Sequence, residues 1–339
     1  MSNVNDPSAA GAPEPPDPPG RASRYAWVGT AASAILFAAA LAVLWQILGE
    51  VKLADVQAAF RNAAREQIAL ALFFTAVSYT LLTAYDALAL RQLKLKIPYR
   101  TTALASFTSY AVSFTLGFPL VTAAGVRYWI YAPRGVPAGK VASLTLIAGL
   151  TFLLGMGTVV GIGLIWQASA IAAINHLGVF ANRLIGVAVL VAIGFYLYWI
   201  GAKPRAVRVK RFRLEMPTLP VSLGQILLGI GDVCAASAVL YVLLPQGHGI
   251  SFETFAAVYA FACILGIASH APGGLGVFEA TILLAFWRLP YDGLIGALFL
   301  FRLCYYLLPF VIAVALLGAY EISRRLNAWR ANVERNEAE

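Results

Sequence analysis

The chain has 339 residues, of which 60% are hydrophobic and only 12% are charged, whereas about 25% are charged in an ordinary soluble domain. This composition excludes a soluble globular protein and predicts an all-α polytopic integral membrane protein, whose spans of about 20 apolar residues satisfy their own backbone hydrogen bonds. The 25 Lys and Arg exceed the 16 Asp and Glu, but they cluster beside the apolar segments, which is typical of topology signals and contacts with anionic lipid headgroups and not of nucleic-acid binding.

The first 24 residues are predicted to form a disordered tail. They contain six prolines among small and polar residues and cannot bury enough surface to offset the entropy of ordering. The first 20 residues lack the basic and apolar regions of a signal peptide, so residues 25–48 are predicted to be an uncleaved first span. Residues 49–66 mix three basic and three acidic residues with apolar ones, which predicts a short amphipathic helix on the membrane surface.

Five further crossings are predicted where long apolar segments recur, at residues 67–90, 141–166, 184–200, 220–244 and 293–319. In the segment 141–166, Gly157 and Gly161 form a GxxxG pair between Gly155 and Gly163. Small residues at this spacing predict that a neighbouring helix approaches closely.

Two other apolar segments are interrupted. Residues 101–126 contain many Ser, Thr and Gly residues and Pro119, and residues 252–288 contain Pro272 followed by three glycines. Because proline removes a backbone donor and glycine disfavours a helix, no continuous helix is expected through residues 271–276. The sequence therefore predicts about six full crossings plus two broken or re-entrant elements, which a hydropathy count scores as eight. Whether the broken elements re-enter or cross stays open.

The distribution of basic residues favours a hairpin at 101–126. If this segment enters and leaves on one side, the basic clusters at 91–100, 203–213 and 324–335 all lie in the cytoplasm with both termini. Two broken elements in opposite halves also suggest inverted repeats that build a site at the bilayer midplane, an idea that rests on topology alone. The predicted organisation is a cytoplasmic tail at 1–24, a transmembrane domain at 25–320 and a cytoplasmic C-terminal tail at 321–339.

Ionisable groups inside a membrane span cost about 2.5–3.5 kcal/mol each at the centre of a lone helix, so each is expected to face a partner or a wet cavity. Glu279 and Arg302 are predicted to pair, because their segments are consecutive. Two interpretations stay open: a buried ion pair that fixes helix packing, or a polar site for a headgroup or coupling ion, which the adjacent break favours. His270, near the edge of the membrane core, is interpreted as a helix-end residue. The candidate substrate-binding residues are Arg127, Glu279, Arg302, Asp86, Asp232, Pro272, Gly273, Gly274 and Gly276.

Signatures of catalysis and metal binding are missing from the sequence. It has no GxSxG, P-loop or HExxH motif, its three histidines are isolated, and Cys234, Cys263 and Cys304 have no CxxC spacing. The polar segments are too short to fold a soluble catalytic domain. We therefore expect no enzyme activity in this chain alone, no cofactor and no metal.

Six short motifs, in this order, carry a family resemblance: YDALAL at 85–90, IPYR at 97–100, LGF at 116–118, GVRYWIY at 125–131, LLP at 243–245 and PGGLGVFE at 272–279. They resemble the transmembrane flippase region of multiple peptide resistance factor, which also occurs as a stand-alone protein in the wider lysylphosphatidylglycerol synthase transmembrane family. The resemblance covers about residues 25–325.

The resemblance implies a bacterial inner-membrane protein that moves lipids, notably aminoacylated phosphatidylglycerol, between leaflets, with a link to antibiotic resistance. Only a short tail follows the last span, so the synthase domain of full-length members is not expected, nor is lysyltransferase activity. Arg127 is expected to receive a phosphate, and Glu279 to attract an amino group or balance Arg302. Close relatives tend to have asparagines before the LGF motif, where this chain has Ser113, Phe114 and Thr115. Another phospholipid, a glycolipid or a polyprenyl-linked cargo therefore stays open.

The expected partners are anionic or aminoacylated membrane lipids, a separately encoded lipid-modifying enzyme, or a second copy of the chain. Two rival functions are also considered. The chain could be the membrane subunit of a lipid-modifying enzyme, or a structural membrane partner that moves nothing.

Overall fold

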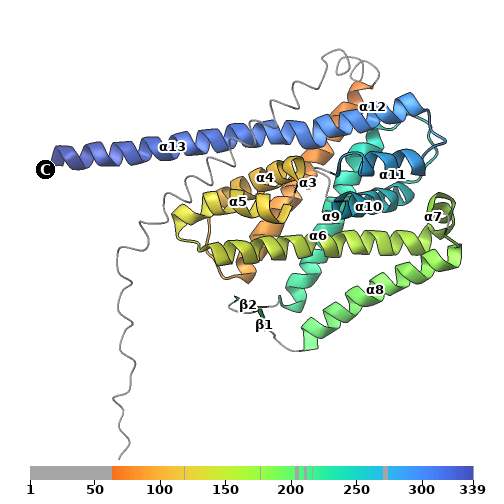
Figure 1. Cartoon of the computed structure of the whole chain (residues 1–339), viewed down its shortest axis with the longest axis horizontal. Coiled ribbons are helices and arrows are strands. Elements are labelled where there is room, and N and C mark those ends of the chain that lie inside the picture. Colours follow the sequence, from red (N-terminus) through yellow and green to blue (C-terminus); the bar gives the residue numbers. More distant parts are fainter. Residues whose placement is uncertain are drawn as a thin grey trace, which may run out of the picture.

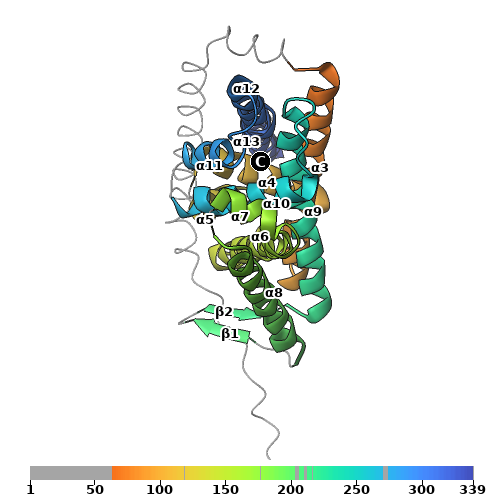
Figure 2. The same ribbon diagram turned by 90° about the vertical axis from the view of Figure 1, so that its right-hand side faces the viewer.

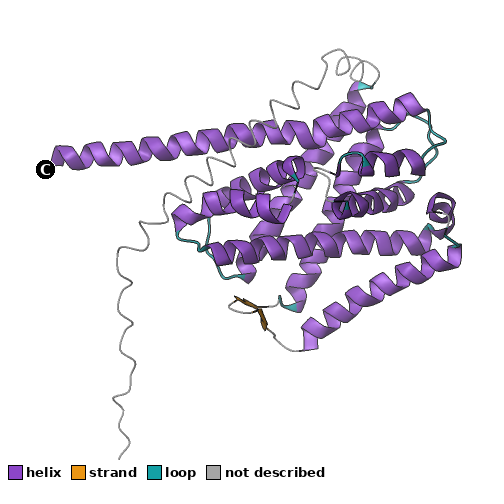
Figure 3. Ribbon diagram, viewed as in Figure 1, coloured by secondary structure: helices purple, strands orange, loops and turns teal. Residues whose placement is uncertain are grey.

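The computed structural model describes residues 63–117, 119–175, 177–202, 206–209, 212–215, 217–269 and 274–338. These residues are almost entirely helical (Figure 3). The exception is one short antiparallel hairpin of β1 (Ala206–Val209) and β2 (Phe212–Glu215), at the basic cluster 203–213. The sequence analysis did not predict this hairpin. The tail at 1–24, the span at 25–48 and most of the surface helix predicted at 49–66 lie outside the described residues.

Five helical segments among the described residues are long and apolar enough to cross a membrane. They are α3 (Arg65–Gln92), α6 (Ala138–Trp166), α8 (Val179–Ala202), α9 (Leu219–Leu243) and the continuous run Tyr291–Asn327. That run joins α12 (Tyr291–Phe301), the π-helical turn η3 (Arg302–Leu307) and the first part of α13 (Leu308–Ala338). The predicted all-α polytopic class is thereby confirmed, and each predicted crossing within the described residues coincides with one of these segments.

The two interrupted segments are broken, as predicted, and each forms a helical hairpin. Residues 101–126 lie in α4 (Tyr99–Leu116) and α5 (Pro119–Tyr131), which pack against each other. Residues 252–288 contain α10 (Phe252–Ala268) and α11 (Val277–Ala285), which also pack together. The longest of these arms has 18 residues, close to the minimum for a crossing. Re-entry on one side of the membrane stays a prediction.

Local sequence explains where the hairpins break. Gly117 adopts a positive φ of 79° directly after α4, and Pro119 begins α5, where its missing N–H costs no helical hydrogen bond. In the second hairpin Gly276 has a φ of 81°, and its backbone N–H donates to Glu279 Oε2 at 2.8 Å. A carboxylate at this position caps the helix and interacts favourably with its N-terminus. Glu279 therefore fixes the start of α11.

Helices α3 and α9 lie side by side and cross α6 and α13 steeply (Figures 1 and 2). At the crossing of α6 and α9 the backbones touch, because a Cβ on Gly229 would lie 2.7 Å from the Cα of Gly155. The close approach predicted from the glycines of α6 is confirmed. The short elements η1 (Ala132–Arg134) and α7 (Ala168–Asn175) connect α5 to α6 and α6 to α8. The buried core lies between α3, α4, α5, α6, α9, α10, α11 and the last span. Its largest apolar side chains include Tyr85, Tyr131, Phe255, Phe301 and Phe310.

Candidate functional site

Both broken hairpins meet the last span at its π-helical turn. From the first hairpin, the ring of Phe114 lies 6.3 Å from the rings of Tyr305 and Tyr306. From the second, Glu279 forms an ion pair with Arg302. Residues of α4 and α11, one helix from each hairpin, therefore contact η3. We define Glu279, Arg302, Phe114, Tyr305 and Tyr306 as the convergence site.

The Glu279–Arg302 pair is the charged centre of the convergence site. Arg302 Nε donates to Glu279 Oε1 at 2.7 Å, and the two side chains are 18% (Arg302) and 23% (Glu279) exposed. The guanidinium carbon of Arg302 also lies 4.4 Å from the centre of the Tyr306 ring, a favourable cation–π distance. The predicted pairing is confirmed. The two side chains are not fully buried, although the Nη2 atom of Arg302 is.

The π-helical turn places Arg302 and Tyr305 differently from residues of a regular helix. A π-turn widens the helix and disturbs its hydrogen-bond ladder, and such turns are frequent at functional sites. Here the hydroxyl of Tyr79, on α3, donates to the backbone carbonyl of Tyr305 at 3.2 Å. The irregular turn is thereby held by a neighbouring helix.

Asp232 belongs to a buried hydrogen-bond network beside the same turn. The hydroxyl of Ser78 donates to its Oδ1 at 2.5 Å, and the hydroxyl of Tyr85 donates to its Oδ2 at 3.1 Å. Ser78 also shares a 2.8 Å hydrogen bond with the hydroxyl of Tyr305. Among the described residues no cation forms an ion pair with Asp232. The network links α3, α9 and η3 through hydroxyl groups.

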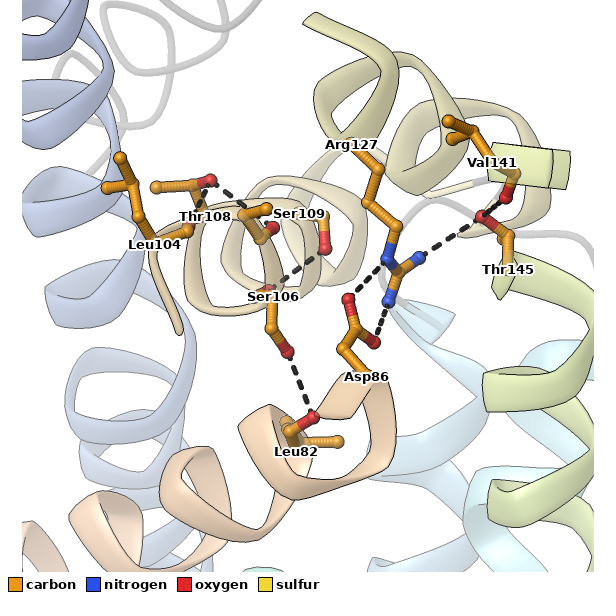
Figure 4. A network of polar contacts seen from close by, with 10 residues as sticks. Leu82, Asp86, Leu104, Ser106, Thr108, Ser109, Arg127, Val141 and Thr145 are labelled. Atoms are coloured by element: carbon orange, nitrogen blue, oxygen red, sulfur yellow. Dashed lines mark hydrogen bonds and ion pairs between the residues drawn. The ribbon is translucent and has the colours of Figure 1, made fainter. Parts of the chain in front are cut away.

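Asp86 and Arg127 form a second ion pair, which the sequence analysis did not anticipate (Figure 4). Arg127 donates from Nε and Nη2 to the two carboxylate oxygens of Asp86, both at 2.8 Å. The side chains are 1% (Arg127) and 0% (Asp86) exposed. Thr145 and the ring of Tyr110 complete the surroundings of the guanidinium. In this conformation Asp86 occupies the Nε and Nη2 atoms of Arg127, the residue that was expected to bind a phosphate.

The predicted site residues therefore fall into three groups. Glu279, Arg302, Gly274 and Gly276 lie at or beside the convergence site, and Asp232 joins it through Ser78 and Tyr305. Asp86 and Arg127 form their own pair, which connects to Asp232 through aromatic packing: Tyr85 stacks edge-on against Tyr110, which contacts Arg127. Pro272, Gly273 and His270 lie outside the described residues.

Sequence reasoning missed the hydroxyl and aromatic members of the site, which are Ser78, Tyr79, Tyr85, Phe114, Tyr305 and Tyr306. Tyr305 and Tyr306 were the best available signal, because two adjacent tyrosines follow Arg302 within one span. Ser113 and Thr115, which precede the LGF motif, donate to carbonyls of their own helix at 3.2 and 3.1 Å. Their hydroxyl protons are therefore used inside α4.

Comparison with known proteins agrees with this architecture. The family model for the lysylphosphatidylglycerol synthase transmembrane region matches residues 27–313. An uncharacterised protein of Synechocystis is 33% identical over 270 residues, covering 79% of this chain and 84% of that protein. The inner membrane protein YbhN of Escherichia coli is 28% identical over 285 residues, covering 83% of this chain and 88% of YbhN.

Phosphatidylglycerol lysyltransferases of Staphylococcus aureus also match. One is 27% identical over 288 residues, which covers 83% of this chain but only 32% of the lysyltransferase. The similarity to these proteins thus concerns about a third of their length. Since the family model spans nearly all of the described helices and the hairpins lie within the match, the chain belongs to the lysylphosphatidylglycerol synthase transmembrane family.

Proposed function

We propose that this protein moves lipids between the two leaflets of the bacterial inner membrane, with no ATP hydrolysis of its own. The observation that supports this most directly is the meeting of both broken hairpins at the π-helical turn that carries Arg302. Transporters build substrate sites from discontinuous helices, because interrupted backbone is stable in a membrane only where protein or a watery cavity satisfies it. The inner-membrane location rests on the match to YbhN.

The charges of the convergence site suit a phospholipid headgroup. A guanidinium forms two parallel hydrogen bonds with a phosphate, so we assign the phosphate to Arg302 and the amino group of an aminoacylated or zwitterionic headgroup to Glu279. Because Nε and Nη2 of Arg302 both contact Glu279, this pair has to loosen when the headgroup binds. Both side chains are partly exposed. The rings of Tyr306 and Phe278 lie beside the guanidinium. Phe278 is buried, so the partly exposed Tyr306 is the ring assigned to the lipid next to its headgroup.

Arg127 has a different place in this proposal. Because Asp86 holds its guanidinium at two positions, Arg127 reaches a phosphate only if that pair opens. We therefore assign the first headgroup contact to Arg302, and to Asp86 and Arg127 the positioning of α3 against α5. Asp232 is a polar neighbour that supports the π-helical turn through Ser78 and Tyr305.

The test is lipid exchange in liposomes that contain the purified protein and fluorescent analogues of phosphatidylglycerol, aminoacylated phosphatidylglycerol and phosphatidylethanolamine. A membrane-impermeant quencher reports the outer leaflet, and a translocase lets the quencher eventually reach nearly all of the label. Exchange as slow as in protein-free liposomes for every headgroup, with and without a proton gradient, would refute the proposal.

A second function is favoured by the match to the lysyltransferases, whose transmembrane third this chain resembles. The chain could serve as the membrane subunit of a lipid-modifying enzyme with separately encoded catalytic machinery. The liposome assay separates the two functions, because a translocase accelerates exchange by itself. A subunit alone leaves exchange unchanged and increases lipid modification only when the partner enzyme is added.

A further inference from the structure

Helix α13 continues far beyond the apolar part of the last span. Its apolar run ends near Ala319, and the helix then extends to Ala338, projecting from the body of the protein (Figure 1). Nineteen residues of helix, 320–338, are about 28 Å long at 1.5 Å per residue. In proteins most of the stability of a helix comes from packing of its apolar face and not from intrinsic propensity.

One face of this extension is apolar and uncovered. Ile322, Leu326 and Trp329 are 61%, 50% and 64% exposed. They are separated by four and three residues, which places them on a single face, and Val333 continues the series at the same spacing. Among the described residues no other element packs over them. Three large exposed side chains in line indicate a binding surface.

Basic residues border this face on both sides. At 100° per residue, Arg325 and Arg330 lie on opposite flanks of the line through Ile322 and Leu326, and both are exposed. An apolar face with Trp and Leu between arginines is the pattern of helices that lie in the headgroup region of anionic membranes. Arginines on the flanks can reach up to phosphates while their stems stay beside the acyl chains.

The same charges argue against a second copy of the chain as the occupant of this face. Two copies in one membrane are related by an axis along the membrane normal, so extensions of α13 that project away from the membrane would pair in parallel. In a parallel pair with Ile322, Leu326 and Trp329 at the seam, Arg325 of one copy faces Arg330 of the other. Like charges at these positions oppose pairing, whereas anionic headgroups complement them.

We propose that the face formed by Ile322, Leu326 and Trp329, with Arg325 and Arg330, binds the anionic surface of the adjacent leaflet. A tilt of α13 or a bend near Gly318 brings the face onto the lipid, since glycine is among the residues that favour a helix least. The root of the extension is tied to the first hairpin: Trp129 Nε1 donates to Glu321 at 3.2 Å, and Arg134 donates to the hydroxyl of Tyr320 at 3.3 Å. These two hydrogen bonds link the lipid-binding extension of α13 to α5 and η1.

The experiment places a spin label at position 326 or, as the matched control on the opposite face, at position 324. Both variants are made in a background in which Cys234, Cys263 and Cys304 are replaced, and are studied in liposomes with and without phosphatidylglycerol. We expect the label at 326 to be more accessible to oxygen than to a water-soluble nickel chelate, and the label at 324 to show the reverse. The difference in accessibility between the labels at 326 and 324 should decrease severalfold without phosphatidylglycerol. The double change Arg325→Glu with Arg330→Glu should have the same effect.

Two outcomes would overturn the proposal. A short distance between labels at 326 in two copies, independent of lipid charge, would make the face a dimer interface. Equal exposure of both labels to water would mean that the face binds nothing.

A second measurement needs no cysteine replacement. Trypsin cleavage at Arg325 and Arg330 of the unaltered protein should be severalfold slower in phosphatidylglycerol liposomes than in neutral ones. Cleavage at Lys94, an exposed residue of the basic cluster on the same side of the membrane, serves as the internal reference. Equal cleavage rates in the two kinds of liposome would also count against the proposal.

Discussion

At the scale of single residues, the protein has two pairs of a carboxylate with a guanidinium that differ in burial. Asp86 and Arg127 are fully buried and joined by two hydrogen bonds, whereas Glu279 and Arg302 are partly exposed and joined at one carboxylate oxygen. Breaking a buried pair leaves an uncompensated charge in a low-dielectric interior, whereas a partly exposed charge keeps some hydration. Mutation should therefore separate a structural pair from a functional one.

The first prediction concerns the buried pair. Asp86→Asn should lower the stability of the folded protein by about 3–5 kcal/mol, because it strands the Arg127 guanidinium. The measurement is thermal unfolding of the protein in detergent. The double change Asp86→Asn with Arg127→Gln should recover much of the loss, since no buried charge remains. A single variant that unfolds at the wild-type temperature would show that Arg127 is not held by this pair.

The second prediction concerns Glu279. Glu279→Gln keeps an oxygen that can accept the Gly276 N–H but removes the charge, so we expect a folded protein that no longer exchanges lipids in liposomes. Glu253→Gln is the matched control, because Glu253 is an exposed residue in the first turn of α10. If Glu279 served packing alone, Glu279→Gln would be unstable and the addition of Arg302→Gln would restore it. Normal exchange by a well-folded Glu279→Gln protein would remove Glu279 from the site.

At the scale of elements, sequence patterns predicted the helices better than their partners. Long apolar runs identify the crossings because the length of an apolar segment can be read from neighbouring residues alone. Pro119 and the glycines at 273–276 identify the breaks in the same way. Pairing is not local. Asp86 and Arg127 lie 41 residues apart, and Ser78 and Tyr305 lie 227 apart, so without a fold nothing in the sequence joins them. Glu279 and Arg302 could be paired in advance because their segments are consecutive.

The glycines of α6 show the same limit. The pair Gly157 and Gly161 correctly predicted a close neighbour, but the tightest backbone contact is made by Gly155, against Gly229 of α9. The sequence shows which positions of a helix carry small residues but not which neighbouring helix these positions contact. The neighbour is decided by the crossing of α6 and α9, a property of the folded bundle.

The third prediction tests this crossing. Gly229→Val should push α6 and α9 apart and lower the unfolding temperature in detergent, because even a Cβ at this position would lie 2.7 Å from the backbone of Gly155. Gly194→Val is the matched control, since a Cβ at Gly194 on α8 would meet no atom within 4 Å. Equal unfolding temperatures for the two variants would show that the contact between Gly155 and Gly229 does not support the bundle.

At the scale of the whole molecule, the orientation in the membrane is the principal prediction from the sequence that remains to be tested. Together with the first span predicted at 25–48, which lies outside the described residues, the five candidate spans make six crossings, an even number that places both termini on one side, provided that each hairpin returns to the side it enters or both cross fully. The basic clusters at 91–100, 203–213 and 324–335 favour a cytoplasmic location for the loops that carry them. Whether the first hairpin re-enters or crosses the membrane therefore determines the side on which β1 and β2 lie.

The fourth prediction follows from this orientation. Position 210, in the loop between β1 and β2, and the end of the chain should share the cytoplasmic side if α4 and α5 form a re-entrant hairpin. In a background without Cys234, Cys263 and Cys304, Lys210→Cys and Asn336→Cys should resist a membrane-impermeant thiol reagent added to intact cells and react after the membrane is opened. Arg183→Cys, at the start of α8 on the opposite side in this topology, should react from outside and serves as the positive control. Labelling of position 210 in intact cells would mean that residues 101–126 cross the membrane once, and the two hairpins could then no longer enter from opposite faces as inverted repeats require.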